Sequence, residues 1–162
     1  MAFLITFTCY GSHLHGAEPG SVDRNHNRVG GRSVSPDIGL VARTQARMRQ
    51  REYRLDEFRR RTVLGAIRQV CLYKNWTLIA VHVRTNHAHA VVDADIAPEA
   101  MMQTFKSHAS RLLNKSEASG TKRWTRHGST RYLWTRDSVE AAVRYVVESQ
   151  GEAMAVFLGT AP

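Results

Sequence analysis

The sequence predicts an α+β fold in which helices pack on an antiparallel sheet. Two observations support this prediction. Short segments rich in β-prone residues alternate with segments of helical periodicity, and two of the predicted strands follow each other closely enough to form a hairpin. The chain has 162 residues, of which 43% are hydrophobic. This is enough for one domain with a buried core, and we expect residues 1–162 to form it.

The first part of the chain contains a strand, a long loop and a helix. Residues 3–10 are rich in Phe, Ile and Thr and predict a strand. Residues 11–40 are rich in turn-forming Gly and Pro and lack regular periodicity, which predicts a long loop whose role we leave open. In residues 55–74, apolar side chains recur at helical spacing, so we expect an amphipathic helix there.

The middle of the chain predicts the hairpin and a second helix. Residues 76–83 and 87–92 are apolar strands, and the three residues between them form the turn. Pro98 suits the first turn of a helix whose apolar side, including Met101 and Phe105, faces the core.

Two elements are expected to complete the fold. After a polar linker, residues 123–134 form a further strand or a basic hairpin. The last helix, residues 137–150, begins at a capping box in which Asp137 is the cap and Glu140 lies three residues later, and it ends before Gly151.

The chain is strongly basic, with a formal net charge of +9 and a calculated isoelectric point of about 10.3. Such a charge favours a polyanionic partner, and nucleic acid is the first candidate. No segment approaches the roughly 18 consecutive apolar residues of a membrane span. The N-terminus lacks the basic start of a signal peptide, so we expect a cytoplasmic protein without a membrane anchor.

A pair of histidines, His87 and His89, is the strongest chemical signal in the sequence. Side chains at i and i+2 of a strand project from the same face, because successive residues alternate between the two faces. The two Cα atoms would lie roughly 7 Å apart, close enough for both imidazoles to bind one metal ion. His82, on the preceding strand, is either an outer group of this site or a structural histidine, and we favour the structural role.

Tyr145 is a candidate nucleophile on the last helix. It lies beside the apolar stripe formed by Val139, Val143, Val146 and Val147, which is expected to pack on the sheet. A tyrosine at the edge of the core with its hydroxyl in water is the simpler interpretation. However, phosphoryl transfer to a phenol needs a metal, a positioned nucleophile and cations for the phosphodiester, and this chain offers all three.

At these residues the sequence resembles the single-tyrosine HUH transposases of the insertion-sequence and REP-associated group. The resemblance rests on residues 82–92 with the histidine pair, on residues 106–114 and on Tyr145 in a C-terminal helix. It implies a ferredoxin-like antiparallel sheet, His87 and His89 as ligands of Mg²⁺ or Mn²⁺, and Tyr145 as the nucleophile.

The same resemblance implies a homodimer in which the tyrosine helix of one subunit often serves the other subunit, and we expect the linker 114–122 to permit such an exchange. Many members of this group have Gln or Asn four residues after the tyrosine, where this chain has Ser149. Glu148 lies about 60° from Tyr145 around a helix and Gln150 about 140°, so helical geometry favours Glu148 as the third ligand. Gln150 is the alternative if the helix loosens before Gly151.

A stretch of basic and aromatic residues between positions 106 and 136 is expected to contact DNA. It contains eight Lys and Arg side chains and one acidic residue, Glu117. Tryptophan and tyrosine in this stretch can stack on unpaired bases, and we expect Trp134 to be the core member of the group. The predicted DNA-binding residues are Lys106, Arg111, Lys122, Arg123, Trp124, Arg126, Arg131 and Tyr132.

Together these features predict a metal-dependent transposase that cleaves and rejoins single-stranded DNA at hairpin-containing element ends through a 5′-phosphotyrosine intermediate. Two alternatives remain open. A non-catalytic or domesticated single-stranded nucleic-acid-binding regulator would not need Tyr145 or the histidine pair. A small metal hydrolase that uses water would turn over without a protein–DNA adduct.

Overall fold

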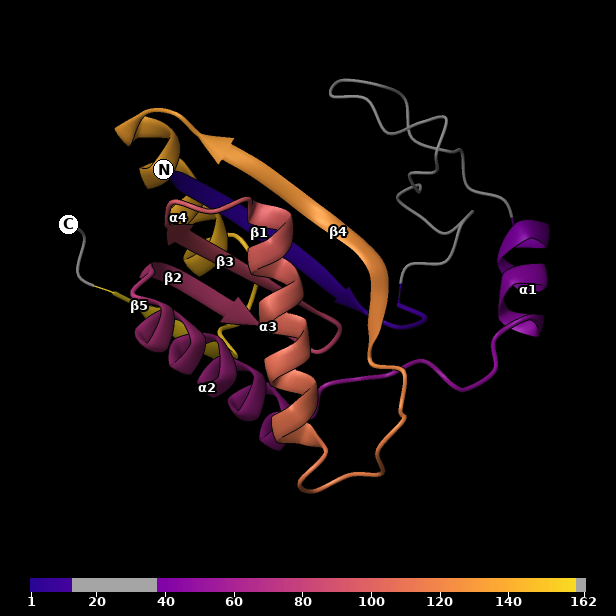
Figure 1. Cartoon of the computed structure of the whole chain (residues 1–162). Coiled ribbons are helices and arrows are strands. Elements are labelled where there is room, and N and C mark those ends of the chain that lie inside the picture. The colour runs from indigo at the N-terminus through magenta and orange to yellow at the C-terminus, as the bar shows by residue number, and fades with distance from the viewer. Residues whose placement is uncertain (13–37, 160–162) are drawn as a thin grey trace.

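The computed structural model describes residues 1–12 and 38–159 and has two layers of helices around one sheet (Figure 1). The elements are listed here in chain order: β1 Ala2–Cys9, α1 Ile38–Ala46, α2 Glu57–Lys74, β2 Thr77–Val83, β3 His87–Asp93, α3 Pro98–Leu113, β4 Trp124–Leu133, α4 Arg136–Glu148 and β5 Ala155–Leu158.

The sheet is antiparallel, with the strand order β4-β1-β3-β2-β5. Its first four strands, together with α2 and α3, follow the connectivity βαββαβ, which is that of a ferredoxin-like fold. The predicted α+β, ferredoxin-like architecture is therefore confirmed. Helices α2 and α3 cover one face of the sheet, and α4 covers the other (Figure 1).

The alternation of side chains along the strands divides the core between the two faces. On β1, Phe3, Ile5 and Phe7 point toward α2 and α3, where the larger hydrophobic cluster lies. Leu4 and its neighbours point toward α4 and form a smaller cluster with Ala142 and Val146 of that helix. This smaller cluster covers only one end of the α4 face, which leaves its other end to polar side chains.

Two predicted boundaries are corrected. The loop predicted over 11–40 ends earlier, because residues 38–46 form α1; residues 13–37 lie outside the described part of the chain. Helix α4 is capped by Thr135, not Asp137. The backbone N–H of Ser138 donates a hydrogen bond to Thr135 Oγ1, and the backbone N–H of Thr135 donates one to Ser138 Oγ. Thr135 has an extended backbone and directly precedes Arg136, the first helical residue, which is the position of an N-cap.

Strand β5 was not predicted. Its four residues, Ala155–Leu158, pair with β2, and the ring of Phe157 lies against the guanidinium of Arg68 of α2. A run of four residues carries too little alternation to be recognised as a strand. In the described part of the chain, no helix is both long and apolar enough to cross a membrane.

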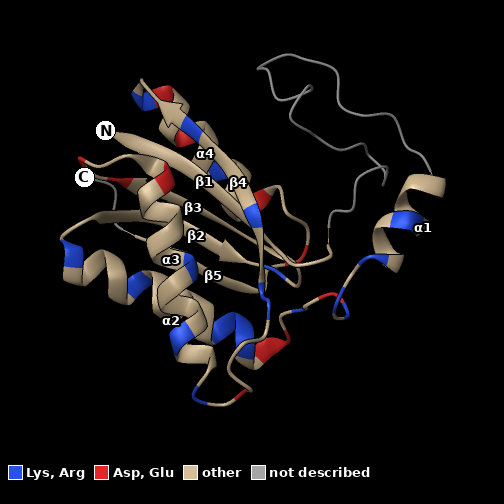
Figure 2. Ribbon diagram, turned by 45° about the vertical axis from the view of Figure 1, so that its right-hand side comes forward, with Lys and Arg blue, Asp and Glu red and all other residues tan. Residues whose placement is uncertain are grey.

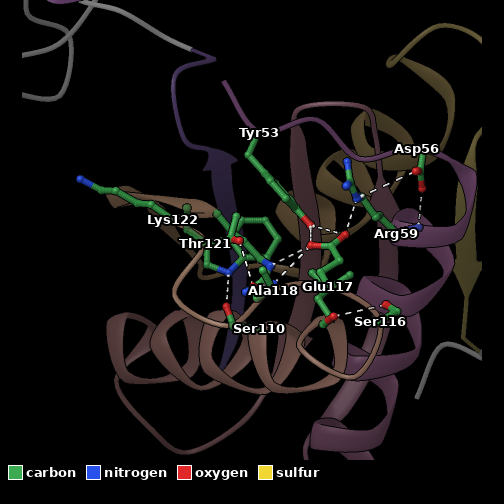
Figure 3. Close-up of polar contacts among 12 residues, drawn as sticks. Tyr53, Asp56, Arg59, Ser110, Ser116, Glu117, Ala118, Thr121 and Lys122 are labelled. Carbon is green, nitrogen blue, oxygen red and sulfur yellow. Dashed lines mark hydrogen bonds and ion pairs between the residues drawn. The ribbon is translucent and has the colours of Figure 1, made fainter. Parts of the chain in front are cut away.

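Glu117 holds the linker between α3 and β4 in place (Figure 3). Its carboxylate accepts hydrogen bonds from the Tyr53 hydroxyl at 2.8 Å, from Arg59 Nε and from Arg123 Nη2 at 3.2 Å. The Arg123 side chain is only 2% exposed, so Glu117 neutralises a buried charge. This cluster fixes the segment that leads into β4.

The pKa values in this cluster follow from its contacts. Burial and the hydrogen bond to Glu117 raise the pKa of Tyr53 to about 12, as expected for a phenol that donates to a carboxylate. Burial alone would raise the pKa of Glu117, but the hydrogen bonds from Tyr53 and Arg59 and the nearby positive charge outweigh it, and the net direction is downward.

We expect Glu117→Gln to lower the free energy of unfolding by roughly 2–3 kcal/mol, because the substitution leaves the Arg123 guanidinium buried without a counter-charge. Urea denaturation measures this change. Since the folded-state pKa of Glu117 is depressed, the advantage of the wild type is complete above the ordinary carboxyl value of 4.5 and disappears as the pH falls through the folded-state value.

The control for this experiment is Glu140→Gln. Glu140 makes an ion pair with Arg136 on the surface of α4, where both side chains are more than half exposed, and we expect its loss to change stability by much less. Equal effects of the two substitutions would contradict the structural role given to Glu117.

Candidate functional site

The polar end of the α4 face of the sheet contains the two histidines that the sequence singled out. His87 and His89 lie on β3 and point to the same face, with their ring centroids 4.7 Å apart. Ala88, between them, is fully buried on the opposite face. The strand alternation therefore places a polar pair and a core residue in consecutive positions.

Each of the two imidazoles is oriented by a hydrogen bond at Nδ1. His87 Nδ1 lies 2.7 Å from Asn86 Oδ1, and His89 Nδ1 lies 2.7 Å from Thr6 Oγ1 of β1. An Nδ1–H that donates to the Asn86 oxygen places the lone pair of His87 on Nε2, and the Thr6 hydroxyl permits the same tautomer for His89. Hydrogen bonds of this kind typically fix the orientation of metal-binding histidines.

His89 is electrically neutral at neutral pH. Burial lowers its pKa to about 4, and the neighbouring His87 contributes to the same shift. Only the neutral form of imidazole can coordinate a metal ion, so the local environment keeps His89 in the form required for this role.

Tyr145 of α4 lies directly over this pair. Its ring centroid is 5.4 Å from that of His89 of the same chain, in an edge-on arrangement, and 44% of its surface is exposed. The valine stripe of α4 packs on the sheet as predicted, with Val146 fully buried. The residue next to Val146 therefore projects along the sheet surface toward the histidines.

His82 holds the C-terminal part of α4 against the sheet. It is fully buried on β2 and is the cross-strand neighbour of His89. Its Nδ1 lies 3.0 Å from the carbonyl of Val146, and its Nε2 accepts the amide of Met154 at 3.2 Å. Both ring nitrogens thus have protein partners, and the expected structural role of His82 is confirmed.

The arrangement of possible third ligands differs from the helical expectation. Within the described residues, no third His, Cys, Asp or Glu lies close enough to complete a metal-binding group with the histidine pair, so Glu148 does not reach it. The side chain of Gln150 instead forms a hydrogen bond with His89, which raises the pKa of His89 but is outweighed by burial. The Nε2 of Gln150 also donates to the Tyr145 carbonyl at 3.2 Å.

The reason for this difference is that α4 ends at Glu148. Gln150 lies two residues beyond the last helical residue, and Gly151 adopts a positive φ of 76°, a conformation that glycine tolerates without strain. The 100° rotation per residue therefore no longer applies at Gln150, and the chain turns this side chain toward the sheet. Of the two residues predicted as a third ligand, the structure therefore brings Gln150, the alternative, to the histidine pair, and does not bring Glu148 there.

Three of the eight predicted DNA contacts have structural roles instead. Lys106 is buried, and its ammonium donates to the carbonyls of Thr125 and His127; Arg123 is buried in the Glu117 cluster. The indole of Trp124 donates to the Lys106 carbonyl and packs edge-on against Phe7. Their donors serve the protein itself, so we withdraw these three residues from the predicted DNA interface.

The other five lie at the surface. Lys122, Arg126, Arg131 and Tyr132 are exposed on or beside β4, and Arg111 is exposed on α3. Trp134 is 71% exposed and stacks on Tyr132, with ring centroids 5.3 Å apart, so the expectation that it belongs to the core is wrong. It follows the last residue of β4 and lies beyond the packed part of the sheet.

The linker 114–122 is the segment expected to permit exchange of the tyrosine helix between subunits. It connects α3 to β4 and is anchored through Glu117, whereas α4 follows β4 after two residues, Trp134 and Thr135. It therefore gives no direct freedom of movement to the tyrosine helix.

Comparison with known proteins identifies the family of this chain. The family described as transposase IS200 like matches residues 39–152, which is more than half of the chain. Among curated proteins, no sequence matches. A solved structure, that of a REP-associated tyrosine transposase bound to a REP hairpin, has the same fold, with a TM-score of 0.50 and 10% sequence identity.

The structural match covers 91% of this chain and 65% of that chain, so the present sequence spans about two-thirds of the length of that relative. The likeness in structure establishes the fold, and the family match extends from α1 to the residues just beyond α4. That region contains His87, His89, Tyr145 and Gln150. The chain belongs to the IS200-like transposase family.

Proposed function

We propose that this protein is a metal-dependent transposase that cleaves and rejoins single-stranded DNA, with Tyr145 as the nucleophile. The observation that carries the proposal is the position of the Tyr145 ring beside His89, on the polar end of the face that α4 covers. A lone exposed tyrosine would mean little. Here it lies next to two oriented imidazoles and an amide side chain, in a member of a transposase family.

The residues at this site suit a divalent metal ion. His87, His89 and Gln150 would supply two imidazole nitrogens and one amide oxygen. Oxygen ligands suit Mg²⁺ and Mn²⁺, and two imidazoles favour Mn²⁺ over Mg²⁺, since affinity for nitrogen ligands is higher for the transition metal. A bound metal would supply positive charge at the oxygens of the scissile phosphate.

The reaction conserves the energy of the phosphodiester bond. The Tyr145 oxygen forms a bond to phosphorus, the bond between phosphorus and the 3′-oxygen breaks, and the phenol proton is lost to the 3′-oxygen or to solvent. The products are a 5′-phosphotyrosine and a free 3′-hydroxyl. Attack of a 3′-hydroxyl on the phosphotyrosine reverses these bond changes and joins two strands, so no nucleotide cofactor is consumed.

We expect Tyr145→Phe to abolish the covalent protein–DNA adduct, because the substitution removes only the attacking oxygen. The measurement is a denaturing gel after incubation of labelled single-stranded element ends with the protein and Mn²⁺. Tyr73→Phe is the matched control, since Tyr73 is exposed on α2, which covers the opposite face of the sheet from α4.

The outcomes of this experiment also distinguish the alternatives. Cleavage without an adduct in the wild type would favour a hydrolase that uses water. DNA binding without cleavage would favour a non-catalytic or domesticated regulator. An adduct that persists in Tyr145→Phe would reject Tyr145 as the nucleophile.

We expect Gln150→Ala to weaken Mn²⁺ binding by roughly tenfold and Glu148→Ala to leave it nearly unchanged. Isothermal titration with Mn²⁺ alone measures both, and His87→Ala and His89→Ala should each reduce binding further. A larger loss for Glu148→Ala than for Gln150→Ala would return the third-ligand role to Glu148.

The proposed DNA substrate is a single strand at a hairpin-containing end. The structural relative was solved with a REP hairpin, and five of the predicted DNA-contact side chains of this chain are exposed. These are Arg111, Lys122, Arg126, Arg131 and Tyr132.

We also propose a homodimer that forms along the edge of β4. This strand is ten residues long, and among the described residues no strand pairs with its outer edge. An edge of this length presents unpaired backbone groups that a second copy can pair with. We expect dimers in sedimentation equilibrium, and slower amide exchange in β4 at higher protein concentration but no change in β5, the opposite edge. A monomer at all concentrations would contradict this proposal.

A further inference from the structure

A basic hollow lies two strands away from the histidine pair. The cross-strand partner of His87 on β1 is Thr8, and the Thr8 hydroxyl lies 2.9 Å from that of Thr125 at the start of β4. Thr125 lines a hollow of about 310 Å³ between β4, the end of β1 and the end of α1. A row of polar side chains thus leads across three strands from the proposed reaction centre to this hollow.

The hollow is positively charged. Its lining includes Arg47, Lys122 and Arg126, and none of the described residues that line it is acidic. Figure 2 shows Lys and Arg along the segment that leads into β4, on α1 and along the segment after α1, which also carries the acidic Glu52. Such a concentration of cations in a concave surface favours an anionic ligand.

The walls of the hollow are held together by specific contacts. The side-chain amide of Gln50 donates to the Lys122 carbonyl at 2.6 Å and accepts the Lys122 amide at 3.0 Å. The Lys122 ammonium lies 4.7 Å from the centroid of the Tyr10 ring. The segment after α1 is therefore tied to the start of β4, and the cations on both sides face the same space.

We infer that this hollow, lined by Arg47, Lys122 and Arg126, binds backbone phosphates of the single strand that flanks the scissile phosphate. The inference rests on the proposed function, and it adds a second site of contact on the same strand. Adjacent strands of a sheet lie about 4.8 Å apart, so the distance from His87 to Thr125 is about 10 Å. A strand that stays stacked as in a duplex advances roughly 3.4 Å per nucleotide and covers this distance in about three nucleotides, and an extended single strand covers it in fewer.

The first test measures binding of fluorescent oligo-dT of 15 nucleotides by anisotropy, without divalent metal, at several salt concentrations. We expect Arg47→Gln and Arg126→Gln each to weaken binding about three- to tenfold and to reduce the slope of log affinity against log salt by about 0.7, as for one lost phosphate contact on a single strand. Arg61→Gln, which removes an exposed charge on α2, is the matched control and should leave both quantities nearly unchanged.

The second test locates the strand. Oligo-dT carrying one photoreactive thymine is cross-linked to the protein, and the attached peptides are identified by mass spectrometry. We expect cross-links in residues 44–54 or 122–131 when the reactive base lies within about three nucleotides of a base that cross-links near His87. Cross-links restricted to other surfaces, or equal losses of binding in Arg47→Gln and Arg61→Gln, would overturn the inference.

The two tests separate this inference from the proposed function. Both measure binding without cleavage, so a failure to form a Tyr145 adduct leaves their interpretation intact. The variants Arg47→Gln and Arg126→Gln are also tested with the duplex dT15·dA15. If they lose more affinity for the duplex than for the single strand, the hollow binds a duplex stem and the assignment to the single strand is wrong.

Discussion

The central strand β3 has to satisfy two different environments, and the arrangement of the site depends on this constraint. One face of the strand lies under α2 and α3 and carries the apolar side chains of Ala88, Ala90 and Val92, which are fully buried. The other face lies beside α4 and carries His87 and His89. Because the side-chain period of a strand is two, a shift of one residue would place imidazoles in the core and expose alanines. Packing of the core therefore also sets the direction in which the histidines point.

The position of Tyr145 follows from how α4 is held. Its valine stripe is buried against one end of the sheet, His82 bonds the Val146 carbonyl, and β5 then returns the chain to the sheet beside β2. Apolar packing sets the height of the helix over the sheet, while the hydrogen bond to His82 sets its position along β2. The end of α4 at Glu148 and the turn at Gly151 together bring Gln150 to the same part of the sheet surface as Tyr145. The proposed nucleophile and the proposed third ligand thus come from one short segment that is anchored on both sides.

The basic segment illustrates how burial divides residues of the same type between two roles. Lys106 and Arg123 are cations in a stretch that attracts DNA by its composition, yet both are buried and bonded to acceptors of the protein. A buried charge is stable only with such partners, so these donors are used internally. Lys122 and Arg126, close to them in sequence, face a hollow and remain available for a polyanion. The net charge of a segment therefore indicates the class of partner and does not identify the residues that meet it.

The sequence by itself determined the α+β class, most of the helices and strands, the shared face of His87 and His89, and the helix that carries Tyr145, because each of these follows from local periodicity. It could not place β5, whose four residues carry too little pattern, or the cap at Thr135, since neighbouring residues also match a capping motif. It also favoured Glu148, because helical rotation is a local rule that holds only while the helix continues. Tertiary structure decided where α4 ends, which cations are buried, and that Tyr145, 56 positions after His89, lies over it in the same chain. These outcomes depend on contacts between segments that are distant in sequence, and such contacts are formed only when the sheet assembles.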